Sequence, residues 1–235
     1  MLVSHQADAT AVPEKTGPRV RMKRILLGSA MELMQRGIVP SVSDVAEAAE
    51  VSRATAYRYF PHQASMIQAA VGEALGPILA WSSQSTDPEK RVADLLAFAY
   101  PRIDEYEATH RATLLLALHQ WTRRTAGTLG DDTEIVRGHR KKLLADAVAP
   151  LRKTLNRAAF DRLTQSLSLI FGTEAFIVLK DIWGLDGEES RNVALWAANA
   201  LVRAAMDEVL TTRKLIPKVR GSGRETAIKL KRKER

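Results

Sequence analysis

The sequence predicts an all-α protein in which an N-terminal three-helix domain containing a helix-turn-helix is joined to a larger helical domain. Two observations predict this fold class. Apolar residues recur at helical spacing through most of the chain, and the alternation of period two that marks strands is absent. Between Ser41 and Gln63, two short helices are separated by a three-residue turn, which is the arrangement of a helix-turn-helix.

The first helix is expected from Pro18, and it ends at Gly37 because glycine commonly terminates helices. Its apolar residues repeat at i, i+4, i+7 and i+8 from Leu26, which places them on one face. Ser41 then suits the N-cap of a second helix, with Asp44 as the partner of a capping box.

The third helix is expected from Arg53 to Phe60, capped by Ser52 and stopped by Pro61. The remainder of the chain is a succession of helical patterns. The expected helical segments are 66–81, 88–107 with a kink at Pro101, 114–121, a segment that reaches Ala149, 158–183, and 188–210.

The domain organisation follows from these patterns and from composition. Residues 1–17 are polar and aperiodic, as is the basic segment 213–235, so both are expected to be disordered. Residues 18–64 are expected to form the helix-turn-helix domain, and residues 65–212 a larger helical domain.

Composition limits the possible functions. The chain has 235 residues and no cysteine, so disulfides and thiolate metal sites are impossible, and no His-rich or acidic cluster has metal-ligand spacing. No apolar run approaches the roughly 20 residues of a membrane-spanning helix. We therefore expect a cytoplasmic protein without a membrane partner, a metal or a cofactor. No nucleophile–base pair, P-loop or dinucleotide fingerprint indicates an enzyme.

Positive charge lies at both ends of the chain. The formal net charge is +8. The segment after residue 212 holds ten basic and two acidic residues, so its own net charge equals that of the whole chain. The helix-turn-helix region is also basic. Two basic ends indicate a polyanionic partner, although a basic tail also serves solubility alone.

The segment VSRATAYRYF at 51–60 resembles the recognition helix of the TetR family of regulators, and SVSDVAEAA at 41–49 resembles the helix before it. The resemblance extends upstream to RMKRILLGSAMEL at 21–33. A weaker likeness joins LIFGTEAFIVLKDIWGLDGEE at 169–189 to the family's dimerisation helix and the turn that follows it.

The resemblance implies that the chain binds double-stranded DNA. The residues expected to contact DNA are Arg53, Thr55, Tyr57, Arg58 and Tyr59 of the recognition helix, Ser41 and Ser43, His62 and Gln63 after the helix, and Arg19, Arg21, Lys23 and Arg24 in an arm that enters a minor groove. Several of them have a structural alternative. Ser41 is first an N-cap, Tyr57 and Tyr59 are also suited to the core, and Arg58 reaches either a base or a phosphate.

Two residues depart from the family pattern. Glu50 stands in the turn where members usually have glycine, so it is strained if its φ is positive. Gln63 stands where members usually have a lysine that binds phosphate, so one contact loses its charge.

The resemblance further implies that residues 18–64 are a DNA-binding domain and residues 65–212 a ligand-binding and dimerisation domain. It also implies a homodimer, an unknown small-molecule effector and a near-palindromic operator. The candidate pocket residues are Trp81, Phe98, Tyr100, His119 and Trp121, each of which is also suited to a structural role. The expected dimer interface consists of Leu167, Ile170, Phe171, Ala175, Val178, Leu179, Ile182, Leu195, Ala198, Leu201, Val202 and Ala205, which would alternatively be the core of one chain.

The sequence therefore predicts a sequence-specific DNA-binding transcriptional regulator, namely a repressor released by a small molecule. A constitutive regulator and a DNA-architectural protein remain as alternatives. An architectural protein would bind all sequences equally, with a steep dependence on salt.

Overall fold

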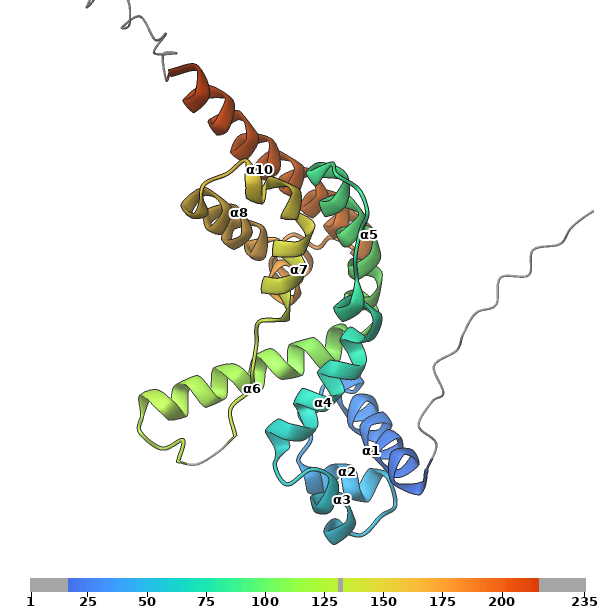
Figure 1. Ribbon diagram of the computed structural model, residues 1–235. Coiled ribbons are helices and arrows are strands. Elements are labelled where there is room, and N and C mark those ends of the chain that lie inside the picture. The colour runs from blue at the N-terminus through green and yellow to red at the C-terminus, as the bar shows by residue number, and fades with distance from the viewer. Residues whose placement is uncertain (1–16, 131–132, 216–235) are drawn as a thin grey trace, which may run out of the picture.

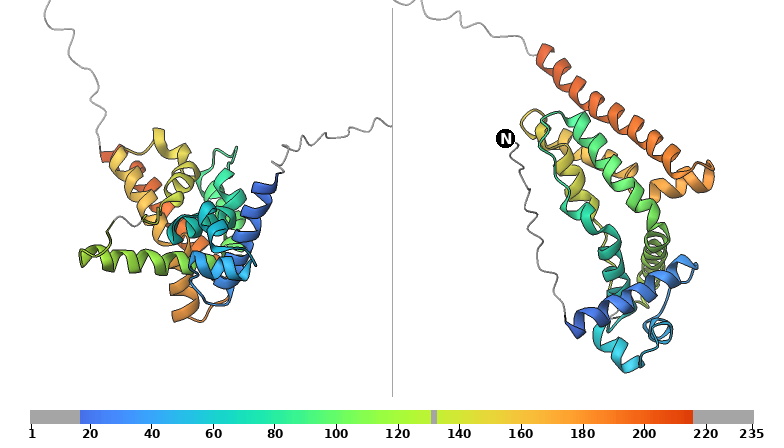
Figure 2. Two further views of the ribbon diagram at one scale, coloured as in Figure 1. Left: turned by 90° about the horizontal axis from the view of Figure 1, so that it is seen from below. Right: turned by 90° about the vertical axis from the view of Figure 1, so that its right-hand side faces the viewer.

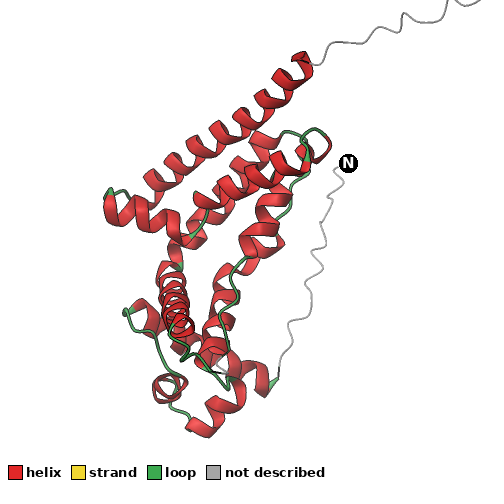
Figure 3. Cartoon of the chain, turned by 90° about the vertical axis from the view of Figure 1, so that its left-hand side faces the viewer, coloured by secondary structure: helices red, strands yellow, loops and turns green. Residues whose placement is uncertain are grey.

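The computed structural model describes residues 17–130 and 133–215, which form helices joined by loops, without strands (Figure 3). The helices form two groups, one above the other in Figure 1, and α6 runs between them. The predicted all-α fold class is confirmed over these residues. Residues 1–16 of the expected disordered N-terminal segment and most of the expected tail lie outside the described residues.

The first group contains α1 (Pro18–Gln35), α2 (Val42–Ala48), α3 (Arg53–Tyr59) and α4 (Gln63–Leu75). Leu26, Val45, Ala56 and Ile67 are fully buried in its core. This core extends along α4 to Ala70 and includes residues of α6, so the expected domain boundary after residue 64 falls inside α4. We refer to α1–α4 as the head.

The second group, which we call the body, is built around two long helices. Helix α5 (Pro88–Glu105) packs along α10 (Gly187–Leu215), as the views in Figure 2 show. The other elements are η1 (Gly76–Ala80), α6 (Glu107–Thr125), α7 (His139–Ala147), η2 (Ala149–Lys153), α8 (Arg157–Leu169), α9 (Thr173–Phe176) and the π-helical η3 (Ile177–Ile182).

The expected continuous helix over residues 158–183 is wrong, because the chain breaks between α8 and α9. Gly172 has a φ of 110°, which favours glycine. The Arg140 guanidinium lies over it, and a Cβ at Gly172 would stand 3.2 Å from one of the Arg140 nitrogens. The break also leaves the Ile170 carbonyl free to accept a hydrogen bond of 2.5 Å from the Tyr100 hydroxyl.

Other helix ends also differ from expectation. The expected helix over 66–81 stops at Leu75, because Gly76 takes a φ of 36° and Pro77 follows it in the 3₁₀ turn η1. Helix α5 runs through Pro101 and ends at Glu105. Helix α10 continues to Leu215, past the expected start of the tail at residue 213.

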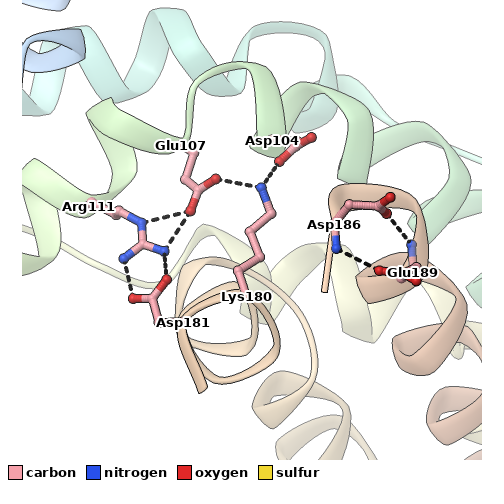
Figure 4. A network of polar contacts seen from close by, with 7 residues as sticks. All are labelled: Asp104, Glu107, Arg111, Lys180, Asp181, Asp186 and Glu189. Atoms are coloured by element: carbon pink, nitrogen blue, oxygen red, sulfur yellow. Dashed lines mark hydrogen bonds and ion pairs between the residues drawn. The ribbon is translucent and has the colours of Figure 1, made fainter. Parts of the chain in front are cut away.

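A network of charges fixes the junction of α5 and α6 against η3 (Figure 4). Lys180 pairs with Asp104 and with Glu107, the latter at 2.7 Å. Arg111 bonds Glu107 at 2.7 Å and forms a two-pronged contact with Asp181 at 2.6 and 2.7 Å. Because each cation bridges two carboxylates, the network holds these three elements in one arrangement.

Among the described residues, Glu50 is the only one other than glycine with a positive φ, at 55°, so the strain expected in the turn is present. Replacing Glu50 with glycine is expected to raise the free energy of unfolding by roughly 0.5–1 kcal/mol, because relief of the left-handed conformation exceeds the added chain entropy of glycine. Urea titration followed by tryptophan fluorescence measures this change.

The matched control for this prediction is Glu47→Gly. Glu47 is exposed within α2, so glycine there is expected to destabilise by about 1 kcal/mol. Equal destabilisation by both variants would contradict the strain at Glu50.

Candidate nucleic-acid interface and ligand cavity

Helix α2 begins at a complete capping box. The Asp44 N–H donates to the Ser41 hydroxyl at 3.1 Å, and the Ser41 N–H donates to the Asp44 carboxylate at 2.8 Å. The hydrogen bonds from the Ser41 backbone and then its side chain hold the pKa of Asp44 below its usual range. The predicted cap is confirmed, and it fixes where α2 starts relative to α3.

Helix α3 is capped by Ser52, whose hydroxyl accepts from the Thr55 N–H at 3.2 Å and lies 2.9 Å from the Thr55 hydroxyl. Ala46 and Ala56 are buried where α2 and α3 pack, and the absence of long side chains there lets the two helices approach closely. The geometry of a helix-turn-helix is therefore present, with its second helix at the lower end of the molecule in Figure 1.

The outward face of α3 carries three of the predicted DNA-binding residues. Arg53, Tyr57 and Arg58 are exposed, and Thr55 is half-buried. The Tyr57 hydroxyl lies 3.5 Å from the Ser43 hydroxyl at the start of α2, so these two helix positions meet on one surface. A convex helix face with two guanidinium groups and a phenol fits the major groove and its phosphate borders.

Tyr59 lies differently from these residues. It is half-buried and packs against the core of the head, with the Arg58 guanidinium 5.8 Å from its ring centre. The alternative that Tyr59 belongs to the core therefore fits its position. His62 is exposed at the start of α4, beside the recognition helix.

Gln63 serves the head internally. Its side-chain amide donates to the Pro40 carbonyl at 3.0 Å and to the Val39 carbonyl at 3.5 Å. The residue therefore ties the loop before α2 to the start of α4, and its donor is not directed at DNA. The expectation that Gln63 contacts DNA is not supported by this position.

The basic residues at the start of α1 are exposed, but they are helical. Arg19, Arg21, Lys23 and Arg24 all lie within α1, which begins at Pro18. The prediction that these four residues form an arm in a minor groove is therefore wrong, because a helix is too wide for that narrow groove. They form a basic surface on α1 instead, where Lys23 and Arg24 line a groove between α1 and α4.

The five candidate pocket residues do not line one cavity. Tyr100 is buried in the body, and Trp81 is half-buried with the Arg91 guanidinium 5.8 Å from its ring centre. Phe98 and Trp121 are 48% and 59% exposed. His119 is exposed at an open groove between the head and α6. Periodicity identified the helices correctly but did not show which faces were covered.

A different cavity of about 90 Å³ lies between the head and the body. Apolar side chains of α4, α5, α6, α7 and the α8–α9 turn line it together with polar residues of α6, α7 and the preceding loop. The lining consists of Val71, Leu75, Ile103, His110, Thr113, Leu114, Val136, Arg137, Gly138, His139, Arg140, Leu143, Phe171, Gly172 and Thr173.

His110 is the buried polar group of this cavity. It is 8% exposed, and its Nε2 atom has no hydrogen-bond partner. Burial first, then the positive charge of Arg140, lowers its pKa to about 4, opposed by Glu107. The imidazole is therefore neutral near pH 7. The spacing of His110 and Thr113 on one helical face was the available sequence signal for this site.

Residues 133–138, which we call the strap, cover one side of the cavity and are held by two glutamines. Gln68 of α4 accepts from the Val136 N–H at 2.9 Å and donates to the Val136 carbonyl at 3.2 Å. Gln120 of α6 accepts from the Ile135 N–H at 2.9 Å and donates to the Thr133 carbonyl at 2.8 Å. The strap therefore links the cavity directly to a helix of the head.

The predicted dimer strip divides into two sets. Six of its residues are buried within the body, which fits the alternative that they form the core of one chain. These six are Leu167, Phe171, Ala175, Ala198, Val202 and Ala205. Val178 and Ile182 are exposed at 46% and 72%, and Ile170, Leu179, Leu195 and Leu201 are half-buried. Three large apolar side chains outside the predicted strip are also exposed, namely Trp183, which follows η3, and Val193 and Trp196 on α10.

The described residues offer neither a metal site nor a membrane-spanning helix. No group of histidine and acidic side chains in residues 17–130 and 133–215 has the arrangement of a metal site. None of the helices in those ranges is both long enough and apolar enough to cross a membrane.

Comparison with known proteins finds a family model and solved structures that resemble the chain. Residues 25–70 match the family model described as bacterial regulatory proteins of the tetR family. A solved TetR transcriptional regulator from Rhodococcus sp. RHA1 aligns with 80% of this chain and 97% of its own, at 18% identity and a TM-score of 0.47. No curated protein matches the chain.

The family match covers the head from within α1 through α3 into α4, which is the segment that carried the resemblance in the sequence. Its members are regulatory proteins, which agrees with the prediction that the chain is not an enzyme. Over these residues the chain is therefore similar to the bacterial regulatory proteins of the tetR family.

Proposed function

We propose that this protein is a dimeric transcriptional repressor that binds a near-palindromic operator through α3 and is released by a small molecule. The observation that carries the proposal is the outward face of α3, where Arg53, Tyr57 and Arg58 project from a helix whose position is fixed by the Ser41 and Ser52 caps. Fixed helices with exposed cationic and phenolic groups suit base and phosphate contacts.

A second copy of the chain is the proposed partner of the outer face of α10 and η3. Trp183 and Trp196 are 72% and 76% exposed, and Ile182 and Val193 lie on the same two elements. Large exposed apolar side chains on neighbouring elements are typical of an interface. A twofold axis through this face gives the molecule two heads, which is why the operator is expected to be near-palindromic.

The proposed release mechanism runs through the strap. Val136 and Arg137 line the cavity, and Val136 is bonded to Gln68 on the face of α4. A ligand that displaces the strap therefore changes the restraint on α4, which packs on α1 and leads directly from α3. Because binding free energies are linked, operator DNA must weaken ligand binding by the factor with which ligand weakens operator binding.

The test is fluorescence anisotropy on a duplex selected from a random pool, against a scrambled duplex, over a salt series. Arg58→Ala is expected to weaken binding to the selected duplex by about 5–150-fold. If the variant no longer discriminates at one base pair, Arg58 contacts that base. If its affinity falls equally for all sequences and the dependence of log affinity on log salt concentration weakens by about 1, Arg58 contacts a phosphate. Arg157→Ala is the control, because this arginine of α8 is exposed on the body.

Three outcomes would contradict the proposal. Unchanged affinity of Arg58→Ala would remove α3 from the interface. Equal, steeply salt-dependent binding to both duplexes would favour the architectural alternative. A selected site that is bound identically whatever small molecule is added would favour the constitutive regulator.

A further inference from the structure

The cavity between the head and the body is electropositive. Its lining includes Arg137 and Arg140 together with His110 and His139, and none of the lining residues, all within the described part of the chain, is an aspartate or glutamate. Glu107 is close enough to His110 to influence its pKa, but it is already paired with Arg111 and Lys180. The cavity therefore has more positive than negative charge at its polar end.

One carboxylate approaches the two arginines from outside the lining. Glu174, in the first turn of α9, pairs with both Arg137 and Arg140. Arg140 also donates to the Ser168 carbonyl at 3.1 Å. A guanidinium has five N–H donors, so these bonds leave Arg140 with donors for a further acceptor, and the two cations together exceed the charge of Glu174 by one.

The rest of the cavity is suited to an apolar body with one further polar contact. Leu75, Leu143 and Phe171 form part of its wall. The buried Nε2 atom of His110 lacks a partner, and the Thr113 hydroxyl donates to the Thr109 carbonyl at 2.8 Å, which leaves its oxygen able to accept. At about 90 Å³ the cavity is smaller than the roughly 150 Å³ of an apolar cavity that admits benzene, so it suits a short ligand or one that extends past the strap.

We propose that this cavity binds a small monocarboxylate with an apolar body, whose carboxylate pairs with Arg140 and Arg137 and whose body lies against Leu75, Leu143 and Phe171. Glu174 occupies the cationic end when the ligand is absent and competes with it. The proposal rests on the proposed function in one respect, since the monocarboxylate would be the effector that releases the operator.

Calorimetric titration of the full chain without DNA tests the ligand class. The probes are butyrate, hexanoate and benzoate, each paired with its amide, which keeps the shape and removes the charge. At least one carboxylate is expected to bind about 10-fold or more tightly than its amide, because charge-assisted hydrogen bonds are stronger than neutral ones. Equal binding of acid and amide, or binding of neither, would overturn the proposal.

Two variants locate the carboxylate. Glu174→Gln removes the competing internal charge and is expected to tighten binding of the carboxylate by several-fold, whereas Arg140→Gln is expected to weaken it by at least about 10-fold. Arg157→Gln, an exposed arginine on α8, is the control for the loss of one positive charge. If Arg140→Gln does not fold, an unchanged affinity of Glu174→Gln still overturns the assignment.

The DNA-free titration separates this inference from the proposed function. Carboxylate binding without any effect on operator affinity would retain the site and remove its regulatory role. Operator binding without any carboxylate binding would retain the regulator and remove this ligand class.

Discussion

Replacing Trp196 with glutamate is expected to convert the protein from a dimer to a folded monomer and to weaken its binding to a two-site operator by at least about 100-fold. Trp196 is 76% exposed on α10, so the substitution leaves the core of the body intact. A carboxylate on the proposed dimer face would lose its hydration without a partner. Once the dimer separates, the second head no longer binds as an intramolecular event.

Sedimentation equilibrium and anisotropy on the same samples measure the two effects. Trp121→Glu is the matched control, because Trp121 is also an exposed tryptophan, at 59%, but lies on α6. It is expected to remain dimeric. A dimer that persists in Trp196→Glu would place the interface elsewhere on the molecule.

Acidification from pH 7 to pH 4 is expected to reduce the free energy of unfolding of the wild type by about 3 kcal/mol more than that of His110→Gln. Burial, and then the charge of Arg140, lowers the pKa of His110 from 6.5 to about 4, although Glu107 acts in the opposite direction. Between these two pH values the unfolded chain binds more protons than the native one. The contribution of His110 to the free energy of unfolding is therefore fully present above pH 6.5 and is lost as the pH falls toward 4.

Urea unfolding at several pH values, followed by tryptophan fluorescence, measures this difference. Carboxylates such as Asp44 and Glu174 titrate in both proteins, so the comparison with His110→Gln isolates the imidazole. His119→Gln is the control for the replacement of an exposed histidine. Parallel profiles for the wild type and His110→Gln would contradict the burial of a neutral His110.

The parts of the structure that depend on neighbouring residues were predictable from the sequence. The Ser41–Asp44 capping box and the Ser52 cap each follow from side chains and backbone within a few positions. The exposed face of α3 followed from Ala56 and Phe60, which are buried on its other face. The positive φ of Glu50 was expected only from the resemblance to a family that has glycine at this position.

The parts that depend on distant residues were not predictable in this way. Periodicity continues through residues 158–183, and only the packing of Arg140 on Gly172 shows why the helix breaks there. Phe98 and Tyr100 lie two positions apart on α5, yet one is exposed and the other buried. The bonds from Gln68 and Gln120 to the strap join residues up to 68 positions apart, and no local pattern marks them.

The strength of the bonds that hold the strap determines how much binding free energy a ligand needs in order to release it. Gln68 holds it to the head through two neutral hydrogen bonds, at 2.9 and 3.2 Å, to an exposed part of the backbone. Two such bonds contribute about 2 kcal/mol in total. A small ligand can form contacts of the same total free energy in the released state alone. Such a ligand shifts the equilibrium between the held and released states by about 30-fold, which lies within the usual range of coupling between distant sites. A charged clamp at the same place would require more energy to open, because hydrogen bonds to charged groups contribute about 1.5–3 kcal/mol each.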